Sequence, residues 1–317
     1  MREAFGRALV ALGEQNERVI VLDGDVCGST KAVYFKERFP NRFVQAGIAE
    51  QNMVGVAAGL AATGLLPYVT TFAVFATKRA CEQISVAVAH ANTNVRICGG
   101  YSGLSSGKAG ATHQAIEDIA IMRAMPNMAV FAPGDDAELA QVMEASLTFP
   151  GPLYVRVGRN EVPAIFDRCH RFRPGEVYCL RQGGDVALIG TGGSTFVVLE
   201  AAELLAAEGI DAAVLHAPSL KPLEAEEIVA AVSATERVIT VEDHNVIGGL
   251  GDAVASVLAQ AHVHARLVKL GMQDTFGESG LEHELREVYG LSPRAVARVG
   301  AALCAARGAG MTGAWQI

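Results

Sequence analysis

The sequence is short of positive charge and of paired cysteines, and each shortage excludes a class of function. Its 317 residues carry 26 lysines and arginines against 34 aspartates and glutamates, which gives a formal net charge of -8. Such a surface repels polyanions, so no nucleic-acid partner is expected. The six cysteines are scattered, with no Cys-x-x-Cys pair and no interleaved histidines, so we predict reduced thiols rather than a zinc site.

No segment of the sequence is predicted to enter a membrane. The N-terminal residues 1–5 open an amphipathic helix and lack the apolar core and cleavage site of a signal peptide, which favours a cytoplasmic location. Residues 51–77 carry no charge, but Gly55, Gly59 and Pro67 interrupt the run, and Ala and Thr dilute its apolar content. We therefore expect a buried helix followed by a buried strand.

The chain does contain enough apolar material for two domains. Half of its residues are hydrophobic, and short β-branched runs alternate with helical stretches, a pattern typical of parallel sheets covered by helices on both faces. The predicted fold class is therefore α/β, with a first domain over residues 1–160, a linker rich in Pro, Arg and Gly over 161–185, and a second domain over 186–317. The predicted strands are 19–22, 66–70, 95–98, 128–132 and 153–157 in the first domain, and 186–190, 213–216, 238–241 and 266–270 in the second.

Residues suited to chemistry follow a short strand that ends at Gly47 and the predicted strands 66–70 and 95–98, and ligands bind at such positions in these folds. Glu50 opens a helix after one strand, although a carboxylate there could merely complement the helix N-terminus, an effect of under about 1 kcal/mol. Phe72 and Phe75 follow the next strand on one helical face, a spacing that core packing also explains. His113 ends a glycine-rich loop, either as a polar residue at a helix start or as a group for proton transfer near neutral pH.

These three segments, in this order, resemble the thiamine-diphosphate-dependent transketolase family. The resemblance covers nearly the whole chain, and its most specific pieces are GIAEQNM (47–53), TFAVF (71–75), GATHQ (110–114), RAMPNM (123–128) and VEDHNVIGGLG (241–251). It implies two doubly wound domains, a mainly parallel-sheet pyrimidine-binding domain followed by a transketolase C-terminal-like domain. It also implies a transferase that moves a two-carbon ketol unit from a phosphorylated ketose to an aldehyde acceptor.

On the cofactor side, the resemblance assigns roles to four residues. Glu50 matches the catalytic glutamate that hydrogen-bonds the aminopyrimidine ring of thiamine diphosphate and promotes the tautomer that removes the thiazolium proton. Burial beside an aromatic base disfavours the charged form of a carboxyl group, so a proton shared with the base is reasonable. Phe72 and Phe75 match the aromatic residues that pack on that ring, and Asp25 resembles an aspartate near the cofactor.

On the substrate side, the resemblance implies four residues that contact the sugar or its terminal phosphate. They are Ser29, Arg159, Arg2 and His113, and the last of these is also assigned to catalysis. Two arginines and a hydroxyl group suit an anion clamp. Without the resemblance, Arg159 reads as a surface residue and Arg2 as part of a disordered terminus.

Three positions depart from the family pattern around the site. Ala109 stands where typical transketolases have an aspartate, Tyr101 where they often have a histidine, and Lys78 near a tyrosine on the cofactor side. Because Ala109 cannot hydrogen-bond a hydroxyl group and Lys108 adds positive charge to the same loop, we expect a nonstandard ketose or acceptor.

The magnesium motif of the family, Gly-Asp-Gly followed by Asn, is not found, since residues 23–25 read Asp-Gly-Asp. The resemblance therefore implies a separate N-terminal subunit that binds the diphosphate and most of the Mg²⁺ shell, with no metal ligand on this chain. We expect self-association to a dimer or an α2β2 heterotetramer through a large apolar interface. The glycine-rich loop 190–194 imitates a phosphate cradle but is assigned to strand-to-helix packing.

Two other functions stay open. The β chain of a 2-oxo acid dehydrogenase complex shares the two-domain plan and a similar glutamate setting, although residues 110–118 look more like transketolase and deoxyxylulose phosphate synthase, the latter normally one long chain. A regulatory or scaffold homologue would keep the fold without binding cofactor, and the joint presence of Glu50, Phe72, Phe75 and His113 argues against it.

Overall fold

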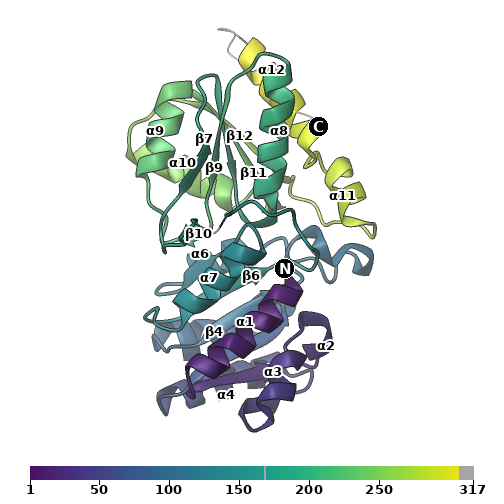
Figure 1. The fold of residues 1–317 in the computed structure, drawn as a ribbon, viewed down its shortest axis with the longest axis vertical. Coiled ribbons are helices and arrows are strands. Elements are labelled where there is room, and N and C mark those ends of the chain that lie inside the picture. Colours follow the sequence, from purple (N-terminus) through teal and green to yellow (C-terminus); the bar gives the residue numbers. More distant parts are fainter. Residues whose placement is uncertain (168, 307–317) are drawn as a thin grey trace.

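Two α/β units follow each other along the long axis of the molecule (Figure 1). They are seen in a computed structural model that describes residues 1–167 and 169–306. Residues 307–317, which the sequence analysis assigns to the second domain, lie outside the described residues. Each unit has a mostly parallel sheet with helices around it, so the predicted α/β class is confirmed.

The first unit contains a seven-stranded sheet in the order β10-β5-β6-β4-β3-β1-β2. Every neighbouring pair is parallel except β10 with β5, which is antiparallel. The strands are β1 (Val19–Asp23), β2 (Phe43–Gln45), β3 (Leu66–Phe72), β4 (Arg96–Gly100), β5 (Ala129–Phe131), β6 (Leu153–Val157) and β10 (Ser219–Lys221). All five strands predicted for this domain are present, and apart from the partly exposed Ile20 and Phe72 their residues are buried.

Helices cover both faces of this sheet. On one face lie α1 (Arg2–Gln15), α3 (Val33–Arg38) and α7 (Asp136–Ser146), and on the other lie α4 (Glu50–Ala62), the π-helical segment η3 (Ile84–His90) and α6 (Asp118–Ala124). Short helical segments complete the unit, namely α2 (Cys27–Thr30), η1 (Pro40–Arg42), the π-helical η2 (Phe75–Arg79), α5 (Cys81–Gln83) and η4 (Leu104–Ala109). The charge-free stretch 51–77 thus contains most of α4 and all of β3. In the described part of the chain, no helix is both long and apolar enough to cross a bilayer.

The second unit has a five-stranded sheet in the order β12-β11-β8-β9-β7. Its elements are β7 (Tyr178–Arg181), β8 (Val186–Gly190), η5 (Gly192–Ser194), α8 (Thr195–Ala207), β9 (Ala212–His216), α9 (Glu226–Thr235), β11 (Arg237–Asn245), α10 (Leu250–Gln260), β12 (Arg266–Met272), α11 (Glu282–Val288) and α12 (Pro293–Ala305). The four predicted strands are all found. The antiparallel edge strand β7 lies within residues 161–185, where the sequence analysis expects a linker, and neither β7 nor α12 is predicted from the sequence.

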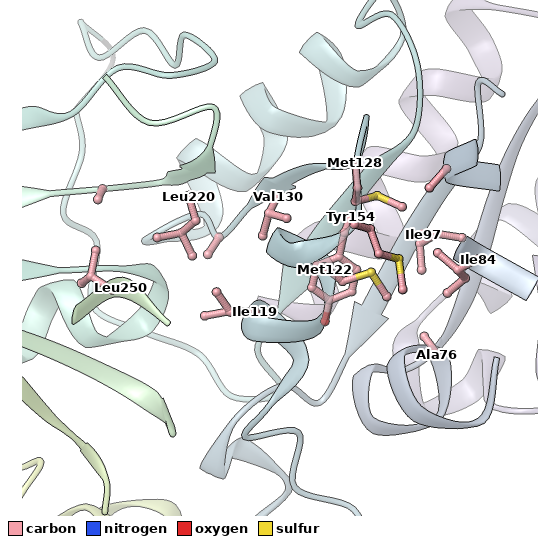
Figure 2. Packing of buried hydrophobic residues seen from close by; sticks show 14 of the residues in the cluster. Ala76, Ile84, Ile97, Ile119, Met122, Met128, Val130, Tyr154, Leu220 and Leu250 are labelled. Atoms are coloured by element: carbon pink, nitrogen blue, oxygen red, sulfur yellow. The ribbon is translucent and has the colours of Figure 1, made fainter. Parts of the chain in front are cut away.

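One hydrophobic core runs from the first sheet into the second unit (Figure 2). Tyr154 and Met122 lie in the first unit, Leu250 belongs to the second, Leu220 lies on β10, and all four are buried in the same cluster. β10 follows β9 of the second unit in the chain but pairs with β5 of the first sheet. The two units are therefore joined by both sheet pairing and shared apolar burial.

A buried ionic network reinforces this joint. Arg156 of β6 donates from Nε to Asp118 Oδ2 at 2.8 Å, and its Nη1 pairs with the carboxylate of Asp243 on β11. Its Nη2 donates to the backbone oxygens of Ala115 and Asp243. Burial alone lowers the pKa of Arg156, but Asp118 and Asp243 together raise it above its usual value. The network thus connects β6 and α6 of the first unit with β11 of the second through buried ion pairs.

A second buried carboxylate joins the units near α7. The two carboxylate oxygens of Glu138 lie 2.9 Å from His170 Nε2 and 2.7 Å from His216 Nε2 of β9, and Oε2 also accepts from the backbone N–H of Gly134. Burial raises the pKa of Glu138, but the attraction of His216 and the hydrogen bonds outweigh burial and lower it to about 2. Glu138 is therefore negatively charged in the native structure.

The acid stability of the protein is expected to depend on Glu138. A carboxyl group whose pKa is lowered in the native state stabilises it above the unfolded pKa, here the ordinary 4.5, and that contribution is lost as the pH falls toward about 2. The wild type should lose roughly 3 kcal/mol more than Glu138→Gln between pH 5 and pH 2. Urea unfolding at each pH measures this difference, with the exposed Glu208→Gln as a control that follows the wild type. Parallel pH profiles for wild type and Glu138→Gln would contradict the expectation.

Candidate active site

The candidate residues gather at the carboxyl edge of the first sheet. Asp25 follows β1, Glu50 begins the helix after β2, Phe75 follows β3, Tyr101 follows β4 and Arg159 follows β6. Because these strands are parallel, their carboxyl ends share one edge, so residues far apart in the sequence reach a common surface. The strand pattern of the sequence predicts this edge for Glu50, Phe75 and His113, whereas the family resemblance implies Asp25 and Arg159.

An aromatic stack forms the centre of the site. The ring centroids of Phe72 and Tyr101 are 4.3 Å apart with an interplanar angle of 24°, and those of Phe72 and Phe75 are 5.8 Å apart at 26°. His113 meets Phe75 edge-on at 5.4 Å and Phe72 at 6.3 Å. All four rings are partly exposed, so they form an apolar wall that a flat ligand can reach.

The buried carboxylate of Glu50 lies beside this stack. Only 1% of its side chain is exposed, and its Oε2 accepts a hydrogen bond from Arg79 Nη1 at 2.7 Å. The same guanidinium group lies 4.7 Å from the centroid of the Phe75 ring. Arg79 therefore connects the carboxylate of Glu50 with the aromatic stack.

Three of the residues assigned to substrate binding surround Tyr101. Arg2 Nη1 donates to the Tyr101 hydroxyl group at 3.0 Å and to the backbone oxygen of Ser29 at 3.5 Å, and the Arg159 guanidinium lies 5.3 Å from the Tyr101 ring centroid. Tyr101 has a φ of 57°, which is uncommon for a bulky residue and costs energy that the surrounding contacts must offset. Two cations are thus held at one end of the aromatic stack.

Asp25 is placed differently from the other cofactor-side residues. It is exposed, and its hydrogen bonds in the described part of the chain go to Gln45, whose Nε2 donates to Asp25 Oδ1 at 3.3 Å. The buried residue in this loop is Asp23, which accepts from the backbone N–H groups of Val26 and Cys27 and from the Thr70 hydroxyl group. Burial raises the pKa of Asp23. Asp23 holds the loop that carries Asp25, a role that the Asp-Gly-Asp pattern does not reveal.

Lys78 and Ala109, which depart from the family pattern, are exposed on η2 and η4. Lys78 pairs with Glu117 at 2.8 Å and lies 5.7 Å from the exposed Phe276 ring of the second unit. Lys108 and Ala109 end η4, where Lys108 is exposed. Lys78 therefore contacts residues of both units.

The site combines a flat apolar face, a buried carboxylate and a cationic end. A planar nitrogen base stacked on Phe75 could exchange a proton with Glu50, and an anion could bind Arg2 and Arg159. Within residues 1–167 and 169–306, His, Cys, Asp and Glu side chains form no group of three or more able to hold a metal ion. The residues present thus fit an organic cofactor with a flat basic ring and an anionic substrate.

Two family models match the chain. The model "Transketolase, pyrimidine binding domain" matches residues 1–164, and the model "Transketolase, C-terminal domain" matches residues 175–296. Together they account for both units of the structure.

Relatives of similar length share this organisation. A putative transketolase C-terminal section of Methanocaldococcus jannaschii is 41% identical over 300 residues, which cover 94% of each chain. A 6-deoxy-6-sulfo-D-fructose transketolase subunit of a Clostridium species is 37% identical over 298 residues, covering 94% of this chain and 92% of the relative. A solved structure described as a split gene transketolase, inactive beta4 tetramer, has 43% identity and a TM-score of 0.86, and the match covers 96% of this chain and 97% of that one.

Proposed function

The chain belongs to the transketolase family, and from that membership we propose that it is the C-terminal subunit of a split, thiamine-diphosphate-dependent transketolase. The reaction is the transfer of a two-carbon ketol unit from a phosphorylated ketose to an aldehyde acceptor. The observation that carries the proposal is the buried Glu50 carboxylate beside the Phe75 ring at the edge of the sheet. Thiamine diphosphate, when bound, supplies the nucleophilic carbon that attacks the ketose carbonyl group.

Glu50 and the two phenylalanines are the residues proposed to act on the cofactor. Glu50 holds a proton at the aminopyrimidine ring nitrogen, and its burial keeps water from competing for that proton. Phe72 and Phe75 present their faces to the ring and fix its plane. Asp25 is proposed to contact the cofactor from the neighbouring loop.

His113 and the cationic end of the site are proposed to bind the substrate. The His113 Nδ1 lies 2.9 Å from the Thr112 hydroxyl group, which orients the imidazole while Nε2 stays available for a substrate oxygen. Arg2, Arg159 and Ser29 hold the anionic end of the sugar. The Ala109 position offers no hydrogen bond to a hydroxyl group, so a ketose that differs from the common donors is proposed.

A partner chain is proposed to complete the site with its diphosphate-binding domain and Mg²⁺, in an α2β2 assembly in the cytoplasm. Three exposed apolar side chains lie on or near α4, the helix that Glu50 begins, namely Ile48 before α4, Val56 on α4 and Val86 on η3, which is packed against α4. Such exposure next to a site favours an interaction surface. The similar split gene transketolase is described as an inactive beta4 tetramer, and we propose that this chain without a partner is inactive as well.

The assembly is tested by native mass spectrometry of the protein isolated with its cellular partners. We expect equal copies of this chain and of a diphosphate-binding chain, with thiamine diphosphate bound, and ketol transfer from xylulose 5-phosphate or another phosphorylated ketose only in this complex. The isolated chain given thiamine diphosphate and Mg²⁺ is the control and should stay inactive. A lone oligomer of this chain that transfers ketol units by itself would overturn the split-subunit proposal, and a partner complex without the cofactor would favour a scaffold.

A further inference from the structure

We propose that Arg79 is a placeholder for the aminopyrimidine ring of the cofactor. Its guanidinium group contacts both Glu50 and the Phe75 ring, and it must leave before the ring of the cofactor can use these two surfaces. This inference rests on the proposed function, because it concerns the same site.

The contacts of Arg79 are those that a stacked nitrogen base would make. Its Nη1 donates to the Glu50 carboxylate at 2.7 Å, and its planar group lies 4.7 Å from the Phe75 ring centroid. A guanidinium group is flat and carries its N–H donors on its edge, so it stacks and hydrogen-bonds in different directions at once. An aminopyrimidine ring that used Glu50 and Phe75 would need the same two surfaces.

Burial explains why Glu50 needs such a partner. A carboxylate with 1% of its side chain exposed is costly unless a cation or hydrogen-bond donors compensate its charge. Arg79 provides that compensation. Its own side chain is 45% exposed, so it can turn toward solvent without unfolding its surroundings.

The local backbone supports a movable residue at this position. Arg79 is the last residue of the π-helical segment η2, and the backbone N–H of Ala80 bonds to the oxygen of Phe75 five residues earlier. π-helical turns are rare, and they frequently mark functional sites. The irregular turn places the Phe75 ring and the Arg79 guanidinium group against each other without a continuous α-helix over residues 75–79.

Removing the placeholder should therefore strengthen cofactor binding. If Arg79 stabilises only the protein without cofactor, Arg79→Met makes that state less stable and leaves the cofactor-bound state unchanged. The free energy of thiamine diphosphate binding then becomes more favourable by the same amount. We expect the dissociation constant of the partner complex for thiamine diphosphate with Mg²⁺ to fall by about tenfold in Arg79→Met. Arg79→Lys keeps the charge but lacks the planar group, so its affinity should lie between the two.

The measurement is isothermal titration calorimetry of the assembled complex, combined with urea unfolding of the empty complex. Arg38→Met is the matched control, because it removes a cation from the exposed pair with Glu14 and should change neither quantity. Tighter binding together with lower stability of the empty Arg79→Met complex supports the placeholder. Unchanged or weaker binding to a complex whose wild type does bind thiamine diphosphate overturns it and leaves the proposed function intact. Absence of binding by the wild type and both variants overturns the proposed function and the placeholder together.

Discussion

Replacing Glu50 by glutamine is expected to lower kcat/KM for ketol transfer by the partner complex by about 10²- to 10⁴-fold, the range typical for loss of a positioned acid–base group. Glutamine has nearly the same shape, and its amide oxygen can still accept the hydrogen bond from Arg79. The amide cannot hold and release a proton, however, so the step that depends on the Glu50 proton is lost. Steady-state transfer from a phosphorylated ketose measures the effect.

The exposed Glu17→Gln is the control for the loss of one negative charge, and its activity should equal that of the wild type. Urea unfolding and cofactor titration of Glu50→Gln separate catalysis from folding and binding. A variant that binds thiamine diphosphate but transfers ketol units at the wild-type rate would show that Glu50 is not the catalytic acid–base group, and it would remove the main support for the proposed chemistry.

Replacing Arg156 by methionine is expected to destabilise the protein by about 3–5 kcal/mol, which is the usual consequence of leaving a buried charge without its partner. The guanidinium group is the shared cation of Asp118 and Asp243, and all three side chains are buried. Asp118 Oδ1 already has no hydrogen-bond partner in the described part of the chain, so no spare donor compensates for the loss. Urea unfolding followed by circular dichroism gives the free energy directly.

A variant that also neutralises both acids, Arg156→Met with Asp118→Asn and Asp243→Asn, separates charge from packing. If uncompensated charge is the cause, the triple variant should regain most of the lost stability, because it leaves no buried ion. A single variant that loses less than about 1 kcal/mol would mean that water reaches the carboxylates and that the network is not a clamp between the units.

Much of the fold could be predicted because parallel strands that are buried on both faces have a simple sequence pattern. The runs that became β6 and β8 match the predicted 153–157 and 186–190 residue for residue. The three-residue strand β10 could not be found this way, since its pairing with β5 depends on contact between distant segments. The four residues of β7 are only half-buried and resemble the irregular chain around them.

The same distinction between local sequence patterns and contacts of distant segments applies to the residues of the site. The motifs around Glu50, Phe72 and His113 could be read from the sequence, and the structure brings these residues to one edge. Arg2 looked like part of a disordered terminus without the family resemblance. The structure instead buries Met1 and fixes its amino group 2.8 Å from Asp136, so the terminus is held in place. Arg79 carries no sequence signal, because a lone arginine in a helical stretch is usually solvated.

The pairing of β10 with β5 also limits where a polypeptide of this design can be divided. Cutting between the two units would leave β5 as an open strand edge with unpaired backbone groups and would uncover the apolar cluster around Leu220. Such an edge invites addition of strands from other molecules and aggregation. A division of the chain inside this pair of units would therefore expose an aggregation-prone edge, whereas a division outside the pair would leave the pairing of β10 with β5 intact.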